Sequence, residues 1–244
     1  AIVLHFFCSF SSNVIMITIP GYSAISPIYE STISRVYRAH RESDHLPVIL
    51  KILKQDYPTP AELTRFKQEY EITQSLDLDG VIKTYGIQNY QNTRVIFLED
   101  FGGESLNAWI SEHSFSLQEF LRIAIQVADA LGAIHQQNVI HKDINPANIV
   151  YNPKTNQVKI IDFGISTVLS RENSSLKNPH ILEGTLAYMS PEQTGRMNRE
   201  IDYRTDLYSL GATFYELLTR HLPFEASDVL ELVHCHIAKQ PVPP

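Results

Sequence analysis

The segment "HKDINPAN" at residues 141–148 carries polar side chains with the spacing H-x-D-x-x-x-x-N. Asp143 is suited to orienting the proton of an attacking hydroxyl, and Asn148 can offer an oxygen to Mg²⁺. A further carboxylate, Asp162, follows a short apolar run and precedes "FG". Three polar residues beside apolar strands at this spacing rarely serve packing alone. The pattern therefore predicts phosphoryl transfer, with Asn148 and Asp162 as metal ligands and Asp143 at the hydroxyl.

Phosphoryl transfer also needs a cation that meets the nucleotide phosphates. Lys51 lies inside the apolar run "VILKIL", and Glu69 follows eighteen residues later, where it can hold Lys51 by an ion pair. Taken alone, Lys51 would more often be a strand lysine whose ammonium reaches water. Glu69 would be one of several solvated helix charges, and Glu71 is a competing partner for the lysine.

Strands dominate the expected structure of the first hundred residues. Alternating or β-branched runs predict strands at 34–40, 46–53, 80–90 and 93–100. Between them, Thr-Pro and an early acidic residue predict a helix at 59–76. After the glycines at 102–103 the pattern becomes helical, and the expected helices are 116–138, 204–219 and 227–239. Two lobes of different character follow from this order.

The helical segments also predict which faces are buried. The apolar stripe expected on the first helix consists of Leu117, Phe120, Leu121, Ala124, Val127, Ala128 and Leu131. Helix 204–219 is apolar nearly all round, which predicts burial on all sides. Ser227 is the expected N-cap of the last helix. Short strands are expected in "NIVYN" and "QVKIID".

Composition limits the classes of partner. The chain has 244 residues, a formal net charge of −7 and a pI near 5.8, which disfavours nucleic acid or an anionic membrane surface as the main partner. Cys8 and Cys235 have no disulfide-like or metal spacing, which indicates reduced thiols and a cytoplasmic chain. Residues 1–21 are expected to form an N-terminal extension with neither a signal peptide nor a membrane span, because the apolar patches lack basic residues and are interrupted by "SFSSN". Since Met16 is the first methionine, residues 1–15 are hypothesised to be non-native.

The chain resembles the protein kinase catalytic domain of the eukaryotic-like Ser/Thr type. "VILK" resembles V-A-I-K, "HKDINPAN" resembles H-R-D-x-x-x-x-N, "DFG" is identical, and "SPE" resembles A-P-E. The resemblance runs from about residue 22 to the end. It is strongest to the kinase domain that precedes ATPase-like, GAF and histidine-kinase modules in bacterial multidomain sensor proteins. It implies an α+β, two-lobed fold, with a strand-rich N-lobe at 22–100 and an incomplete helical C-lobe at 101–244.

The resemblance also implies roles for individual residues. Lys51 would contact the α- and β-phosphates and pair with Glu69, Asp143 would meet the substrate hydroxyl, and Asn148 and Asp162 would hold Mg²⁺. The adenine site would be formed by Val36, Val150, the gatekeeper Leu98, and backbone groups of Glu99 and Phe101. His141 and Asp206 would be structural, and Thr185 would lie near Asp143. The implied cofactors are ATP and Mg²⁺. The implied partners are a protein substrate and further domains of a longer chain.

Several positions depart from the family pattern. The Gly-rich loop has Tyr29, Ser31 and Ser34 where glycines are expected, which predicts looser contacts between backbone N–H groups and phosphates. We expect the hydroxyls of Ser31 and Ser34 to donate to phosphates instead. Asn145 stands where a Ser/Thr kinase carries Lys. Its uncharged amide predicts a slow enzyme, and a lysine there would then raise kcat. The loop could instead have adapted around Asn145 by using Lys142 or Thr185.

Two other function classes remain open at this point. A pseudokinase that binds nucleotide as a regulatory module is favoured by the missing glycines and Asn145, and disfavoured by the presence of Lys51, Asp143, Asn148 and Asp162. A small-molecule phosphotransferase shares H-x-D-x-x-x-x-N. The segments "GTLAYMSPE" and "DLYSLG" argue against it, because they resemble the protein-substrate region of kinases.

Overall fold

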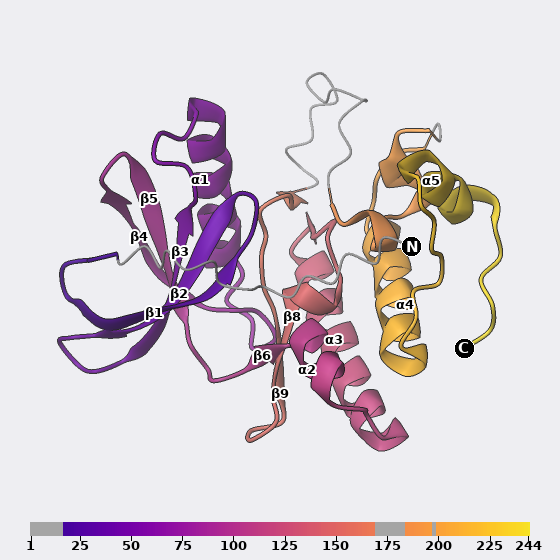
Figure 1. The fold of residues 1–244 in the computed structure, drawn as a ribbon, viewed down its shortest axis with the longest axis horizontal. Helices are drawn as coiled ribbons and strands as arrows, with labels where there is room; N and C mark the ends of the chain where they lie inside the picture. The colour runs from indigo at the N-terminus through magenta and orange to yellow at the C-terminus, as the bar shows by residue number, and fades with distance from the viewer. Residues whose placement is uncertain (1–16, 169–183, 197–198) are drawn as a thin grey trace. The chain divides into compact units, whose positions relative to one another are not determined.

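The computed structural model describes residues 17–168, 184–196 and 199–244 (Figure 1). The hypothesis about residues 1–15 therefore lies outside the described residues. The described chain divides into two compact units. We call residues 17–77 and 82–102 the sheet unit, and the described residues among 78–81 and 103–244 the helical unit.

The sheet unit is a five-stranded antiparallel sheet with one helix. Its strands are β1 (Tyr22–Glu30), β2 (Ser34–Arg41), β3 (Pro47–Leu53), β4 (Thr84–Tyr90) and β5 (Thr93–Glu99), in the order β1-β2-β3-β5-β4. The predicted strand at 80–90 begins only at Thr84. Strand β1 was not predicted, and its pairing with β2 contains register shifts, which break the alternation that marks a strand.

The helix of the sheet unit, α1 (Pro60–Ser75), begins at a capping box. The Thr59 hydroxyl accepts the Glu62 N–H at 3.3 Å, and the Glu62 carboxylate accepts the Thr59 N–H at 2.7 Å. The buried face of α1 contains Phe66, which packs with Leu53 and Ile96 of the sheet. This packing turns the helix face that carries its buried residues toward β3 and β5.

Cross-strand register decides which sheet face carries each side chain. Leu50 on β3 pairs with Tyr37 on β2 and belongs to a buried core together with Ile19 and Phe97. The next residue, Lys51, must point to the opposite face, because successive strand residues alternate. That face is the one covered by α1. The apolar neighbours of Lys51 therefore determine its direction.

The helical unit consists mainly of helices with short strands between them. Its helices are α2 (Leu106–Glu112), α3 (Leu117–Gln136), α4 (Arg204–Thr219) and α5 (Val229–Ala238). Its strands are β6 (Glu104–Ser105), β7 (Val139–Ile140), β8 (Ile149–Asn152), β9 (Gln157–Ile160) and β10 (Thr167–Val168), which form the sheets β6-β8-β9 and β10-β7. Short 3₁₀ turns are η1 (Pro146–Asn148), η3 (Leu186–Tyr188) and η4 (Pro191–Thr194). The predicted α+β class is confirmed.

Two predictions about helix faces and caps were wrong, and a third was confirmed only in part. On α3 the buried residues are Phe120, Ile123, Val127, Ala130, Leu131 and Ile134. The predicted stripe is thus confirmed at Phe120, Val127 and Leu131. Leu117 and Leu121, in contrast, are 66% and 47% exposed, because tertiary packing covers the side of α3 that carries Ile123, Ala130 and Ile134. Helix α4 is not buried on all sides, since Leu207 and Leu218 are exposed. The N-cap of α5 is Asp228, whose carboxylate accepts two N–H groups of the first turn.

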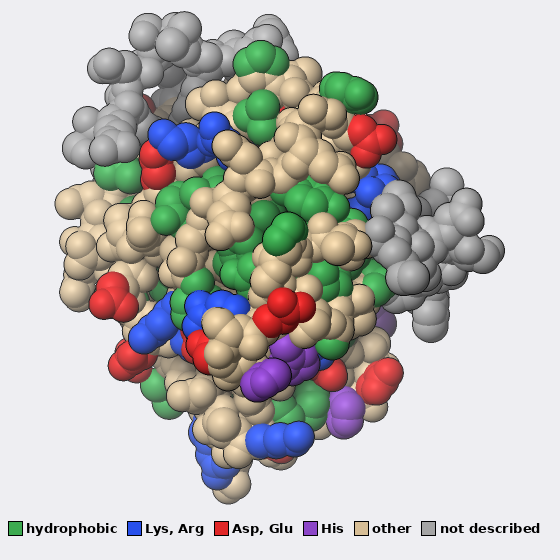
Figure 2. All heavy atoms as spheres, turned by 90° about the vertical axis from the view of Figure 1, so that its left-hand side faces the viewer, with side chains coloured by type: hydrophobic (Ala, Val, Ile, Leu, Met, Phe, Trp, Pro, Cys, Tyr) green, Lys and Arg blue, Asp and Glu red, His purple; other side chains and the backbone are tan. Residues whose placement is uncertain are grey.

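The described surface has neither a membrane-spanning helix nor, on the face shown in Figure 2, a region of one charge sign. In the described part of the chain, no helix has both the length and the apolar character that a membrane crossing requires. Figure 2 shows one face of the molecule, on which hydrophobic side chains gather near the middle and Lys and Arg side chains lie close to Asp and Glu. On this face the charges are therefore mixed.

Candidate active site

The sheet unit holds Lys51 in a buried ion pair. Its Nζ donates to Glu69 Oε1 at 2.6 Å, and each of the two side chains is only 10% exposed. A buried charge without a partner is costly, so each side chain keeps the other in place. Glu71, the competing partner, is exposed and pairs instead with Lys67 at 2.9 Å.

The proposed adenine-binding residues Val36, Leu98 and Glu99 of the sheet unit lie on β2 and β5, the two strands that flank β3. Val36 on β2 is the cross-strand partner of Lys51, and Leu98 on β5 is that of Ile49. The Glu99 N–H donates to Lys83 O at 2.9 Å, which fixes the end of β5. Val36 is therefore beside Lys51, as a site for base and phosphates requires.

Asp100 and Arg38, which sequence reasoning missed, determine the path of the chain around Phe101. The Asp100 carboxylate accepts the Gly102 N–H at 3.0 Å and also binds the Arg38 guanidinium through both oxygens. The Asp100 side chain is 7% exposed. Arg38 thereby ties β2 to residues 99–102, and Gly102 supplies the left-handed turn, with φ 75°. An Asp two residues before a Gly was the sequence signal for this turn.

The two serines of the β1–β2 turn have partners of their own. The Ser31 hydroxyl oxygen accepts the N–H groups of Ile33 and Ser34 at 3.1 and 2.9 Å. The Ser34 side chain is buried and lies 3.2 Å from the Ser31 oxygen. The expectation that both hydroxyls donate to phosphates does not match these contacts.

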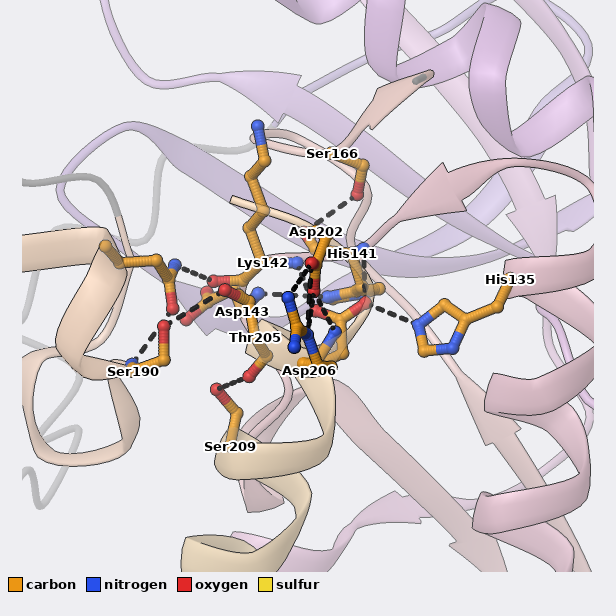
Figure 3. Close-up of polar contacts among 12 residues, drawn as sticks. His135, His141, Lys142, Asp143, Ser166, Ser190, Asp202, Thr205, Asp206 and Ser209 are labelled. Atoms are coloured by element: carbon orange, nitrogen blue, oxygen red, sulfur yellow. Dashed lines mark hydrogen bonds and ion pairs between the residues drawn. The ribbon is translucent and has the colours of Figure 1, made fainter. Parts of the chain in front are cut away.

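In the helical unit, Asp206 holds the catalytic loop (Figure 3). Its fully buried carboxylate accepts the N–H groups of His141 and Lys142 at 2.8 and 2.7 Å, and His135 Nε2 lies 2.8 Å away. Lys142 has a positive φ of 70°. The backbone turns sharply at Lys142, and the Asp206 carboxylate accepts the two backbone N–H groups at this turn.

His141 is part of the protein core. It has no exposed surface, and its Nε2 lies 3.0 Å from Ile161 O. The Asp143 N–H donates to Nδ1 at 3.3 Å, so Nε2 carries the proton and donates to that carbonyl. Both ring nitrogens of His141 are therefore engaged by backbone groups.

Asp143 is oriented by two residues. Asn148 Nδ2 donates to Asp143 Oδ2 at 3.0 Å and to its carbonyl at 2.8 Å. The Thr185 N–H donates to Asp143 Oδ1 at 2.9 Å. Each carboxylate oxygen has a second lone pair, so one can still accept a hydroxyl proton. This arrangement presents Asp143 in a defined direction.

Asn148 and Asp162 flank the β8–β9 pair. Ile149 pairs with Ile160, and the Ile161 N–H donates to Asn148 O at 2.9 Å. The side-chain nitrogen of Asn148 makes the contacts with Asp143. Among the described residues, no hydrogen bond to the side-chain oxygen of Asn148 is formed. Asp162 adopts a left-handed conformation, with φ 64°. An amide oxygen and a carboxylate from adjacent segments fit Mg²⁺, which takes few protein oxygens beside phosphate oxygens and water. Val150 lies on β8 in the same strand pair.

Asn145 is a structural part of the loop. It is 3% exposed, and its Oδ1 accepts the Ala147 N–H at 2.9 Å. Its Nδ2 donates to Asp143 O at 3.0 Å and to Thr185 Oγ1 at 3.3 Å. Its amide nitrogen is therefore engaged by one acceptor inside the loop and by one on Thr185, outside it. The contacts favour a loop adapted around Asn145 over an amide aimed at a γ-phosphate.

Replacing Asn145 by Lys is therefore expected to lower kcat, by about 10-fold, and not to raise it. Lysine has no acceptor for the Ala147 N–H and must fit where the amide was buried, which disturbs the backbone that carries Asp143. Steady-state kinetics measures the effect. Asn107→Lys, at an exposed position on α2, is the control and should match the wild type. A higher kcat for Asn145→Lys would show that Asn145 is only a weakened substitute for lysine.

The segment after Thr185 is anchored on α4. The Tyr188 hydroxyl donates to Glu216 Oε2 at 2.5 Å. Burial raises the pKa of the Glu216 carboxyl and also that of the Tyr188 phenol. This contact holds η3, and with it the Thr185 backbone, in place beside Asp143.

Comparison with known families identifies the domain. Residues 22–242 match the family described as protein kinase domain. The chain belongs to this family. The kinase fold expected from the sequence is thereby confirmed, with an antiparallel sheet and one helix in the first part and helices in the second.

The relatives of this kinase domain include bacterial Ser/Thr kinases. It is 31% identical over 225 residues to a probable serine/threonine-protein kinase of Clostridium perfringens, covering 91% of this chain and 32% of that protein. It is 28% identical over 230 residues to the serine/threonine-protein kinase PknB of Mycobacterium tuberculosis, covering 92% and 35%. It is 31% identical over 231 residues to the serine/threonine-protein kinase pkn3 of Myxococcus xanthus, covering 91% of this chain and 42% of that protein. The chain thus spans about a third of the length of the first two.

In this kinase domain a further contact was missed by sequence reasoning. Gln193 Nε2 donates to Lys142 O at 2.8 Å, and a Cβ at Gly184 would lie 3.1 Å from the same oxygen. Gly184 has φ 112°, which an L side chain rarely adopts. Gly184 therefore lets the backbone approach the catalytic loop closely enough for the Thr185 N–H to reach Asp143. In the sequence, the dipeptide "GT" at residues 184–185 was the signal that could have indicated this close approach.

Proposed function

We propose that this domain transfers the γ-phosphoryl group of ATP to Ser or Thr hydroxyls of proteins, with Mg²⁺ as the metal. The observation that carries the proposal is the orientation of Asp143 by Asn148 and Thr185. Asn148 and Asp162 are the proposed oxygen ligands of the metal. Family membership implies ATP and a protein substrate. Mg²⁺ is proposed from the donor set. The buried Lys51–Glu69 pair of the sheet unit supports the same chemistry.

Each residue has a distinct role in this proposal. Lys51 neutralises phosphate charge, and Glu69 keeps the ammonium directed. Asp143 accepts the hydrogen bond of the substrate hydroxyl and takes up its proton as the bond to phosphorus forms. Asn148 orients Asp143 with its nitrogen and leaves its oxygen for the metal. When bound, Mg²⁺ would offset the charge that develops on the phosphate oxygens.

Adenine would contact Val36, Leu98 and Val150, with backbone groups of Glu99 and Phe101 as hydrogen-bonding partners. Val36, Leu98, Glu99 and Val150 lie on strands of their own units, which gives these groups a rigid support, and Phe101 follows β5 by two residues. The Arg38–Asp100 contact supports the path of residues 99–102.

We further propose a larger context for the domain. The relatives from Clostridium perfringens and Mycobacterium tuberculosis are about three times as long as the aligned region, which supports a kinase module within a longer signalling protein. The sequence resemblance to sensor proteins suggests ATPase-like, GAF and histidine-kinase modules as its other domains. A cytoplasmic location is proposed from the cysteine usage. Cys235, which is buried and unpaired in the structure, agrees with that usage.

The decisive assay measures label transfer from γ-labelled ATP to generic Ser/Thr protein substrates and to the protein itself, with Mg²⁺ and with EDTA. We expect EDTA to abolish transfer, and Asp162→Ala to reduce it by at least about 100-fold, because a metal ligand is lost. Asp79→Ala removes an exposed carboxylate and should leave transfer unchanged.

The same assay separates the competing functions. Nucleotide binding by calorimetry without any transfer by the wild type would support a pseudokinase. Transfer to aminoglycosides or choline with none to protein would support a small-molecule phosphotransferase. Unchanged transfer by Asp162→Ala would remove that carboxylate from the metal site.

A further inference from the structure

We propose that the Ser31 hydroxyl occupies the position of a nucleotide phosphate oxygen in the β1–β2 turn and competes with it. The turn then binds phosphate only after Ser31 releases its own contacts, and the affinity for the triphosphate part of ATP is lowered. The inference rests on the proposed function and adds a specificity-determining residue to it.

The turn is closed by a compact set of contacts. The Ser31 N–H donates to Ser34 O at 2.8 Å. Ser31 Oγ accepts the N–H of Ile33 at 3.1 Å and that of Ser34 at 2.9 Å. Its proton can go to Ser34 O or Ser34 Oγ, both 3.2 Å away. One side-chain oxygen therefore collects two consecutive backbone donors.

The hydroxyl has no capacity left for a ligand. A serine hydroxyl offers one proton and two lone pairs. In Ser31 both lone pairs face backbone N–H groups, and the proton has acceptors within Ser34. Ser31 can donate to a phosphate only by breaking this set.

The two N–H groups are those that an anion would use. Consecutive backbone N–H groups directed at one point form an anion-binding concavity. In protein kinases the loop between the first two strands covers the nucleotide phosphates. Ile33 and Ser34 belong to this loop, and their N–H groups converge on Ser31 Oγ. A glycine at position 31 would leave both donors open.

Backbone geometry makes the idea testable. The residues of the β1–β2 turn are absent from the positive-φ residues of the described chain, so the turn does not need glycine. Ser31→Ala therefore removes the oxygen without backbone strain. Phosphate oxygens are charged and form stronger hydrogen bonds than a hydroxyl, so they can displace Ser31, but the lost contacts reduce the gain.

The test compares affinities for Mg²⁺·ATP and for adenosine by calorimetry in wild type and Ser31→Ala. We expect the variant to bind ATP about 3- to 10-fold more tightly, the equivalent of losing one or two competing hydrogen bonds. Adenosine affinity should not change, because adenosine has no phosphate. Ser26→Ala, which removes an exposed serine of β1, is the matched control and should bind both ligands like the wild type.

A second measurement follows the donors directly. Without nucleotide, hydrogen exchange of the Ile33 and Ser34 amides should be faster in Ser31→Ala than in wild type. ATP should slow it again, while adenosine should not. A purely structural role of Ser31 would give faster exchange with no recovery on adding ATP.

The outcomes are distinguishable. Weaker ATP binding by Ser31→Ala would mean that the hydroxyl donates to phosphate, and it would overturn the proposal. An unchanged ATP affinity would overturn it as well. A wild type that binds neither ATP nor adenosine would refute the proposed function itself, and the inference with it.

Discussion

Replacing Asp143 by Asn is expected to reduce phosphoryl transfer by about 10²- to 10⁴-fold, the usual contribution of a general base. Asparagine keeps the size of the side chain but cannot take up the hydroxyl proton. ATP affinity should stay within a few-fold, since the contacts of Asp143 are with Asn148 and Thr185. Steady-state kinetics and calorimetry measure the two quantities separately.

The control for this variant is Asp129→Asn, at an exposed position on α3, which should retain full activity. The assignment of Asp143 would fail if its replacement weakened ATP binding as much as turnover. It would also fail if turnover fell by less than about 10-fold.

Replacing Asp206 by Ala is expected to destabilise the protein by about 3–5 kcal/mol and to abolish transfer. The change leaves the buried N–H groups of His141 and Lys142, and the His135 ring, without their acceptor. The loop that carries Asp143 then loses its anchor. Urea unfolding gives the stability change, and label transfer gives the activity.

Asp206→Asn separates the anchor from overall stability. Its oxygen can accept one N–H group, but its NH₂ faces the other, so part of the stability should return while activity stays low. Asp129→Ala should change the free energy of unfolding by less than about 0.5 kcal/mol, as expected for an exposed site. An active and stable Asp206→Ala protein would show that the loop keeps its shape without the carboxylate.

Much of the fold followed from local sequence signals. Thr59 with Glu62 predicted the start of α1, and the β-branched run around Lys51 predicted β3. These elements depend on residues a few positions apart, so periodicity and caps suffice to find them. Strand β1 escaped prediction because its irregular pairing with β2 breaks the alternation.

The sequence by itself determined which residues are candidates for the site, because their spacing within short motifs reflects chemistry. Tertiary structure alone decided how they are used. It paired Lys51 with Glu69 and left Glu71 to Lys67. It directed the amide nitrogen of Asn145 to the backbone of Asp143 in the same loop and to the Thr185 hydroxyl outside it. The contacts of Lys51 with Glu69 and of Asn145 with Thr185 join segments far apart in the chain. They depend on which donors and acceptors are buried away from water and need a protein partner, and a local sequence pattern does not contain that information.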